Sequence, residues 1–149
     1  MKTLSTSLLL TAAALLLLAG QAAAHCEIPC GIYDDAMRIN MILEHVTTIE
    51  KSMNQILFHE KEQPHNANQL VRWIMNKEQH ADDLQQIVSQ YFMTQRLKPG
   101  ADHYQAMLAQ LHEMLIYAMQ SKQTTDLDNV KKLRELTAAF EKLYFGPKE

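Results

Sequence analysis

Both cysteines of the chain lie in one short segment, with a histidine directly before the first. The segment "HCEIPCGIY" runs from His25 to Tyr33 and contains Cys26 and Cys30. If His25 were the N-terminal residue, its amine and imidazole would stand beside the amide nitrogen and thiolate of Cys26, and the thiolate of Cys30 would return through a turn containing Pro29. Two chelate rings would then share the Cys26 amide, which favours the planar coordination that nickel(II) and copper(II) prefer over zinc. The segment therefore predicts a redox-active metal site.

The residues before this segment are typical of an export signal. Lys2 gives a positive start, Leu8 to Leu18 form an apolar run, and Ala22 to Ala24 offer small residues to a signal peptidase. The apolar run is short for a membrane span and lacks a stop-transfer flank. We therefore expect cleavage after Ala24, which would make His25 the N-terminus of an exported protein, either periplasmic or secreted.

Residues 25–149 have a length that suits a single domain with one hydrophobic core. We expect residues 1–24 to be removed and residues 25–33 to form a metal-binding hook on this domain. Of the 14 basic residues only Lys2 would be lost, so 13 basic against 17 acidic residues leave a formal charge of −4. Without a basic tract, the processed chain is expected to bind neither nucleic acid nor an anionic membrane.

A disulfide between Cys26 and Cys30 is the alternative interpretation, because exported proteins meet an oxidising compartment. Such a bridge would close a very small loop, and the stabilisation expected from a disulfide grows with loop length. It would do little for the core. The alternative function is that of an exported helical protein that is non-catalytic, either closed by this disulfide or binding a metal.

Apolar residues recur at three- and four-residue steps in four stretches, as one face of a helix requires. The stretches are Asp35–His59, Leu70–Phe92, Tyr104–Ala118 and Leu127–Tyr144. Thr125 and Asp128 are a possible capping pair at the start of the fourth helix. No stretch shows strand alternation. The sequence predicts an all-α protein, an antiparallel four-helix bundle with an N-terminal metal-binding hook.

The remaining histidines and the methionines do not predict a further site. The histidines outside the hook and helix two share no ligand spacing and are interpreted as surface or interfacial residues: His45, His59, His65, His103 and His112. The methionines of the processed chain are scattered on or beside apolar faces. Filling gaps in the core is a better interpretation than copper trafficking.

The segment "HCEIPCGIYDDAMRI" resembles the N-terminal hook of the nickel superoxide dismutases, His-Cys-x-x-Pro-Cys-Gly-x-Tyr, at every fixed position. A weaker resemblance continues through the chain, chiefly in its helical character, its length and "NKEQHAD". The resemblance implies an enzyme that converts superoxide to oxygen and hydrogen peroxide by Ni(II)/Ni(III) cycling. It also implies one nickel ion per subunit and a four-helix bundle assembled as a homohexamer.

The resemblance gives each hook residue a role. His25 would bind nickel through its amine and imidazole, Cys26 through its amide and sulfur, and Cys30 through its sulfur. Pro29 would shape the turn that returns Cys30 to the metal. Tyr33 would stand over the open face of the plane, where its hydroxyl orders water or the incoming anion.

Two departures from the family pattern concern residues around the ligands. A glutamate of helix one commonly orients the axial imidazole and is held by an arginine of helix two, whereas this chain offers Asn40 and His80 at these places. Asn40 and His80 are therefore predicted to support the His25 imidazole, with Glu44 as a possible substitute carboxylate. Glu27 replaces an aspartate common in the hook.

Copper monooxygenases that hold copper with an N-terminal histidine are a competing enzyme class. They resemble β-sandwiches and need a second histidine instead of two thiolates. The helical pattern and the paired cysteines argue against this class.

Overall fold

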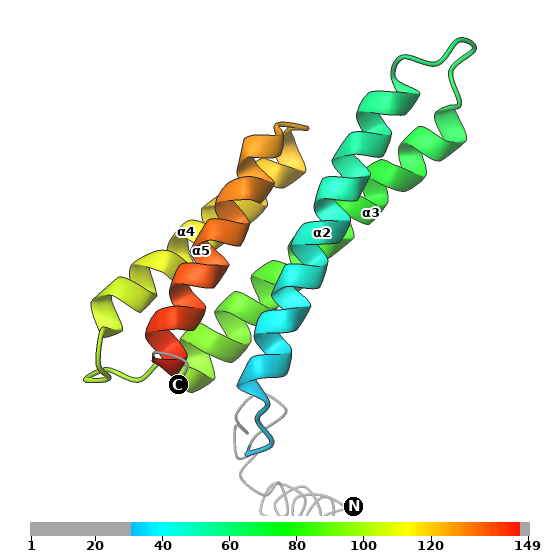
Figure 1. The fold of residues 1–149 in the computed structure, drawn as a ribbon. Helices are drawn as coiled ribbons and strands as arrows, with labels where there is room; N and C mark the ends of the chain where they lie inside the picture. The colour runs from blue at the N-terminus through cyan, green and yellow to red at the C-terminus, as the bar shows by residue number, and fades with distance from the viewer. Residues whose placement is uncertain (1–30, 147–149) are drawn as a thin grey trace, which may run out of the picture. The chain divides into compact units, whose positions relative to one another are not determined.

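The computed structural model describes residues 31–146, which form a four-helix bundle (Figure 1). Its elements are α2 (Asp35–His59), α3 (Ala67–Gln86), the continuation of α3 in η1 (Ile87–Arg96), α4 (Tyr104–Gln123) and α5 (Leu127–Phe145). The all-α prediction is confirmed, and the expected first helix has the observed bounds. The hook residues from His25 to Cys30 and the expected export signal lie outside the described residues. Within residues 31–146, no helix has the length and apolar character that crossing a membrane requires.

The core is built from the apolar stripes of all four helices. Ile42, Leu84, Leu111 and Leu133 are fully buried, one on each helix. The stripes are imperfect at two places, because Ile74 and Leu127 belong to the predicted apolar faces but are 39% and 38% exposed. Burying an aliphatic side chain of this size stabilises a fold by about 1.5–3 kcal/mol, so the stripes account for the association of the helices.

Polar side chains define the helix ends. The Met37 backbone N–H donates to Asp34 Oδ1 (2.8 Å), which caps α2. At the start of α5 the cap is Asp126, whose Oδ1 accepts from the Asp128 N–H (3.0 Å). The predicted Thr125–Asp128 pair is therefore wrong, because the helix begins at Leu127 and Asp126 occupies the capping position.

The second helix changes its pitch after Gln86. From Ile87 to Arg96 the chain forms a π-helix, in which hydrogen bonds join residues five apart. The Leu97 N–H donates to the Phe92 carbonyl (2.8 Å), and the Thr94 hydroxyl donates to the Ser89 carbonyl (2.7 Å). A helix here was predicted from the apolar pattern, but its π register was not.

One end of the α2–α3 pair extends past the α4–α5 connection (Figure 1). Lys77 Nζ donates to the carbonyls of Lys122 (2.5 Å) and Thr124 (3.2 Å), which places Lys77 level with that connection. Asn76 Nδ2 donates to Ser52 Oγ (2.9 Å), which aligns α2 with α3 at the same level. Residues 53–76, called here the α2–α3 tip, therefore project beyond the other two helices.

Candidate functional site

Tyr33 is the last residue of the predicted hook and lies within the described part of the chain. Its side chain is 40% exposed. The Arg96 guanidinium lies over its ring, 4.3 Å from the centroid, and the Tyr91 ring meets it edge to face at 6.0 Å. A cation over an aromatic face and an edge-to-face ring pair are both attractive. Residues of η1 therefore hold Tyr33 at the start of α2.

Asp35, two residues further on, accepts four hydrogen bonds. Arg96 donates through Nε to Oδ1 (2.8 Å) and through Nη2 to Oδ2 (2.7 Å). The Tyr91 hydroxyl donates to Oδ1 (2.6 Å) and the Tyr144 hydroxyl donates to Oδ2 (2.9 Å). Asp35, Tyr91, Arg96 and Tyr144, here called the Asp35 cluster, thus join the first turn of α2 to η1 and α5.

The Asp35 cluster fixes the charge states of its members. Burial alone would raise the pKa of Asp35, but the hydrogen bonds from Arg96, Tyr91 and Tyr144 outweigh burial and lower this pKa. Burial and the hydrogen bond to Asp35 raise the pKa of Tyr91 to about 12. The pKa of Tyr144 is raised for the same two reasons. Both tyrosines therefore remain protonated hydrogen-bond donors at neutral pH.

The π register explains how Tyr91 and Arg96 reach the same carboxylate. In an α-helix each residue is rotated by about 100°, so residues five apart point about 140° away from each other. A π-helix instead joins residues five apart by hydrogen bonds and brings them to one face. Tyr91 and Arg96 both contact Asp35 Oδ1, as this register requires.

Arg38 adds a second cation one turn along α2. Its guanidinium lies over the Tyr91 ring, 5.0 Å from the centroid, and its Nη1 lies 3.8 Å from Met41 Sδ. Its Nε is buried and has no hydrogen-bond partner among the described residues. Within residues 31–146 no carboxylate pairs with Arg38, whereas Arg96 is paired with Asp35. A buried donor without an acceptor is costly in a folded protein.

A cleft lies on the other side of the Asp35 cluster. Its volume is about 550 Å³, and Arg96 and Tyr144 form part of its wall. His103 and Lys142 line the same cleft. Arg96 thus contacts the Tyr33 ring and also lines an open cleft.

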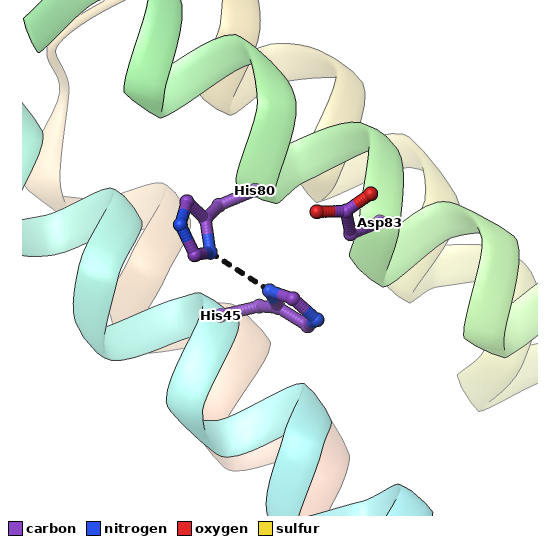
Figure 2. Close-up of side chains that lie close together, drawn as sticks. All are labelled: His45, His80 and Asp83. Atoms are coloured by element: carbon purple, nitrogen blue, oxygen red, sulfur yellow. Dashed lines mark hydrogen bonds between the residues drawn. The ribbon is translucent and has the colours of Figure 1, made fainter.

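The two residues predicted to support the His25 imidazole, Asn40 and His80, lie in different surroundings. Asn40 is exposed and has no hydrogen bond to another described residue, and Glu44 is exposed as well. His80 is half-buried, and its Nδ1 lies 2.8 Å from His45 Nδ1 (Figure 2). Since His25 lies outside the described residues, the Asn40–His80 relay stays a prediction.

The contact between His45 and His80 was missed by the sequence reasoning. His45 was interpreted as a surface or interfacial residue without a ligand partner, but it is half-buried and faces His80 across the α2–α3 interface (Figure 2). The 35-residue separation gives no local spacing signal. Only the alignment of α2 with α3 brings the two rings together.

The sequence is similar to a known protein family. A family model described as nickel-containing superoxide dismutase matches residues 20–148, which is most of the 149-residue chain. Neither the search of curated proteins nor the search of solved structures found a match. The matched range runs from the hook through all four helices.

Proposed function

The chain belongs to the nickel-containing superoxide dismutase family, and from this premise we propose that the hook from His25 to Tyr33 is its nickel site. The protein is a nickel-dependent superoxide dismutase, which converts superoxide to oxygen and hydrogen peroxide. The observation that carries the assignment of the site is that the family match includes the hook, where both cysteines of the chain stand.

The proposed ligands fit nickel by their chemistry. His25 would bind through its amine and imidazole, Cys26 through its amide and thiolate, and Cys30 through its thiolate. Anionic sulfur and amide donors favour the higher oxidation state, and a planar donor set suits nickel better than zinc. When bound, nickel supplies a centre that alternates between Ni(II) and Ni(III), with one ion per subunit.

The described residues have defined tasks in this proposal. Superoxide is an anion. Arg96 lies over the Tyr33 ring but is paired with Asp35. Arg38, which pairs with no carboxylate of residues 31–146, places positive charge over the neighbouring Tyr91 ring, in a processed chain whose formal charge would be −4. Such a local field raises the concentration of an anionic substrate at the site. Peroxide formation consumes two protons for each pair of superoxide ions. The Tyr33 hydroxyl would hold a proton and order water at the approach to the ligands.

The remaining hook and support residues have secondary roles in the proposal. Pro29 would shape the turn between the cysteines, and Glu27 would occupy the place of the usual aspartate. Asn40 would donate to or accept from the His25 imidazole, because its exposed amide has no partner among residues 31–146. His80 would act behind it. Electron paramagnetic resonance of the nickel-loaded protein tests this part in His80→Ala, since loss of a supporting residue would change the spectrum more than the metal content.

The location of the protein is part of the proposal. Residues 1–24 would direct export to the periplasm or the medium, and cleavage after Ala24 would free the His25 amine. Mass spectrometry of the native N-terminus measures the cleavage position directly. A chain that retains Ala24 should fold as a bundle but show no nickel redox activity, because its His25 nitrogen is an amide.

The assembly is also part of the proposal, a homohexamer as the family resemblance implies. Apolar side chains on the α2–α3 tip support an association between copies of this chain. Phe58 is 57% exposed, Val71 is 53% exposed and Met75 is 65% exposed. Exposed apolar side chains on one projecting part of a protein are typical of a surface that a partner covers.

The decisive experiment replaces each thiolate separately. Cys26→Ser and Cys30→Ser should each lose redox-active nickel and dismutase turnover while far-UV circular dichroism remains that of the wild type, because the core lies in residues 39–140. His112→Ala, an exposed change on α4, is the matched control and should keep both activity and nickel. Wild-type nickel content and turnover in either cysteine variant would overturn the two-sulfur assignment. A free-thiol assay separates the hook from the disulfide-closed alternative.

A further inference from the structure

A group of three potential metal ligands, none of them a proposed ligand of the hook, lies between α2 and α3. His45 is contributed by α2, and His80 and Asp83 are contributed by α3 (Figure 2). One ligand atom of each residue lies within 4.8 Å of the others. His80 and Asp83 are three residues apart on a helix, so they share a face. All three side chains are half-buried.

The two imidazoles already share a hydrogen. His45 Nδ1 and His80 Nδ1 are 2.8 Å apart, so one nitrogen donates and the other accepts. Burial lowers the pKa of His45, and the neighbouring charge of His80 lowers it further, while Asp83 and Glu44 act in the opposite direction. His45 is therefore biased toward neutral imidazole, which is the form of histidine that binds metals.

Asp83 is oriented from its own helix. Gln79 Nε2 donates to Asp83 Oδ1 (2.9 Å), and the second carboxylate oxygen accepts no hydrogen bond from a described residue. A carboxylate that is held through one oxygen and open at the other is a common arrangement around metals, where outer groups position the ligands. Gln79 would be such a positioning residue.

We propose that His45, His80 and Asp83 form a second metal site, which shares no ligand with the hook, for a divalent transition ion of the zinc(II) type. An ion at this place would take His80 out of the support of the His25 imidazole. Two imidazoles and one carboxylate are a donor set that zinc accepts, with water as the fourth ligand. With metal–nitrogen bonds of about 2.0–2.1 Å, tetrahedral ligands stand about 3.3 Å apart, so the two Nδ1 atoms need to separate by about half an ångström. The ion takes the place of the bridging hydrogen, whose proton moves to Nε2 of the donor ring.

The position of the site separates it from the Tyr33 end of the molecule. His45 lies ten residues beyond Asp35 on α2, which is about 15 Å of helix. An ion at this place would tie α2 to α3, because its ligands come from both helices. We expect it to raise the stability of the α2–α3 pair, as any ligand of the folded state does.

The test uses the full chain with the hook ligands removed together, as His25→Ala, Cys26→Ser and Cys30→Ser. Cobalt(II) is the probe, because it gives visible absorption when four-coordinate, and zinc(II) is the competitor. We expect one cobalt per chain, displacement by zinc, and a zinc-dependent rise of the thermal midpoint. His45→Ala and His80→Ala in this background should each abolish stoichiometric binding, and Gln79→Ala should weaken it about tenfold.

The controls separate the second site from the hook. His112→Ala, an exposed histidine variant on α4, should leave cobalt binding unchanged. In the processed wild-type background, Asp83→Asn should keep nickel and turnover.

Absence of cobalt binding in the hook-free chain would overturn the proposal, as would binding that His45→Ala leaves intact. A hook-free chain that binds nothing, together with a His45→Ala change in the nickel spectrum of the wild type, would assign the histidine pair to the hook instead. If an alanine variant fails to fold, Asp83→Asn in the hook-free background replaces it and should weaken cobalt binding at least tenfold.

Discussion

A single carboxylate secures the place where the hook joins the bundle. Asp35 accepts hydrogen bonds from Tyr91, Arg96 and Tyr144, and Arg96 in turn covers the Tyr33 ring. Charge-assisted bonds with a bidentate arginine are stronger and more specific in direction than neutral ones. The direction in which the chain leaves α2 toward Gly31 is therefore set by side chains of η1 and α5.

Asp35→Asn should destabilise the fold in a pH-dependent way. The pKa of Asp35 is lowered in the folded protein, so its charge stabilises the fold at pH values above the ordinary 3.8 and this contribution is lost as the pH falls through the lowered value. We expect the free energy of unfolding to fall by about 2 kcal/mol at pH 7, which is the typical contribution of a hydrogen bond to a charged group. Urea unfolding of both proteins from pH 7 to pH 2 measures it. A difference that stays constant over this range would contradict the electrostatic origin.

Tyr33→Phe should keep nickel, because the ring contacts of Arg96 and Tyr91 do not involve the hydroxyl. What should change is the response to anions, measured as azide binding and as the dependence of turnover on superoxide concentration. Tyr91→Phe is the comparison, since it removes a hydroxyl from Asp35 and leaves the one on Tyr33. Loss of nickel from the Tyr33 variant would assign this tyrosine to holding the hook.

At the scale of elements, η1 decides which side chains reach Asp35. Its five-residue hydrogen-bond step places Tyr91 and Arg96 on one face, and π-helical segments often occur at functional sites. A regular α-helix of the same sequence would turn one of the two away. The irregularity thus positions the residues around Tyr33.

Deletion of Thr94 should convert this stretch toward an α-helix in which Tyr91 and Arg96 are four residues apart, a separation that an α-helix also brings to one face. Arg96 should therefore still reach Asp35. Thr94 is exposed, and Thr94→Ala keeps the chain length, so it is the matched control and should be nearly neutral. Asp35→Asn should lower the free energy of unfolding by about 2 kcal/mol in the deletion background as in the full-length chain, the size of a hydrogen-bonded charge. A much smaller loss in urea unfolding of the double variant, as expected for two changes that remove one interaction, would show that the Asp35 cluster needs the π register itself.

The elements differ in how far the sequence predicts them. The apolar steps of α2 are a local signal, and they gave the observed bounds. The π register of η1 depends on contacts with Asp35, 56 and 61 residues away in sequence, which a periodic pattern does not contain. The His45–His80 pair was missed for a similar reason, since it depends on the alignment of two helices. The metal site of the hook stays a prediction, because its proposed ligands from His25 to Cys30 lie outside the described residues.

At the scale of the whole molecule, the α2–α3 tip is the largest departure from a compact bundle. It lies beyond the level of Lys77, where α4 and α5 connect, and carries Phe58, Val71 and Met75 with more than half of each side chain exposed. Since α4 and α5 end before it, no other helix of residues 31–146 covers this surface (Figure 1). Contacts with further copies of the chain are the proposed cover.

Met75→Glu should weaken the assembly without unfolding the subunit, because the side chain is 65% exposed and a buried charge opposes association. Sedimentation velocity should show a smaller species at low protein concentration. Met119→Glu on α4, at a side chain 40% exposed, is the matched control and should keep the wild-type mass. An unchanged mass for the Met75 variant would place the contacts between copies elsewhere.

The tip also carries the single tryptophan of the chain. Trp73 is half-buried, and the Lys51 ammonium lies over its ring, 5.8 Å from the centroid. The Asp35 cluster and the His45–His80 pair both lie outside residues 53–76. Indole fluorescence therefore reports on this end of the molecule. Its emission maximum and its quenching by iodide should follow dilution of the oligomer, giving an optical readout of subunit dissociation.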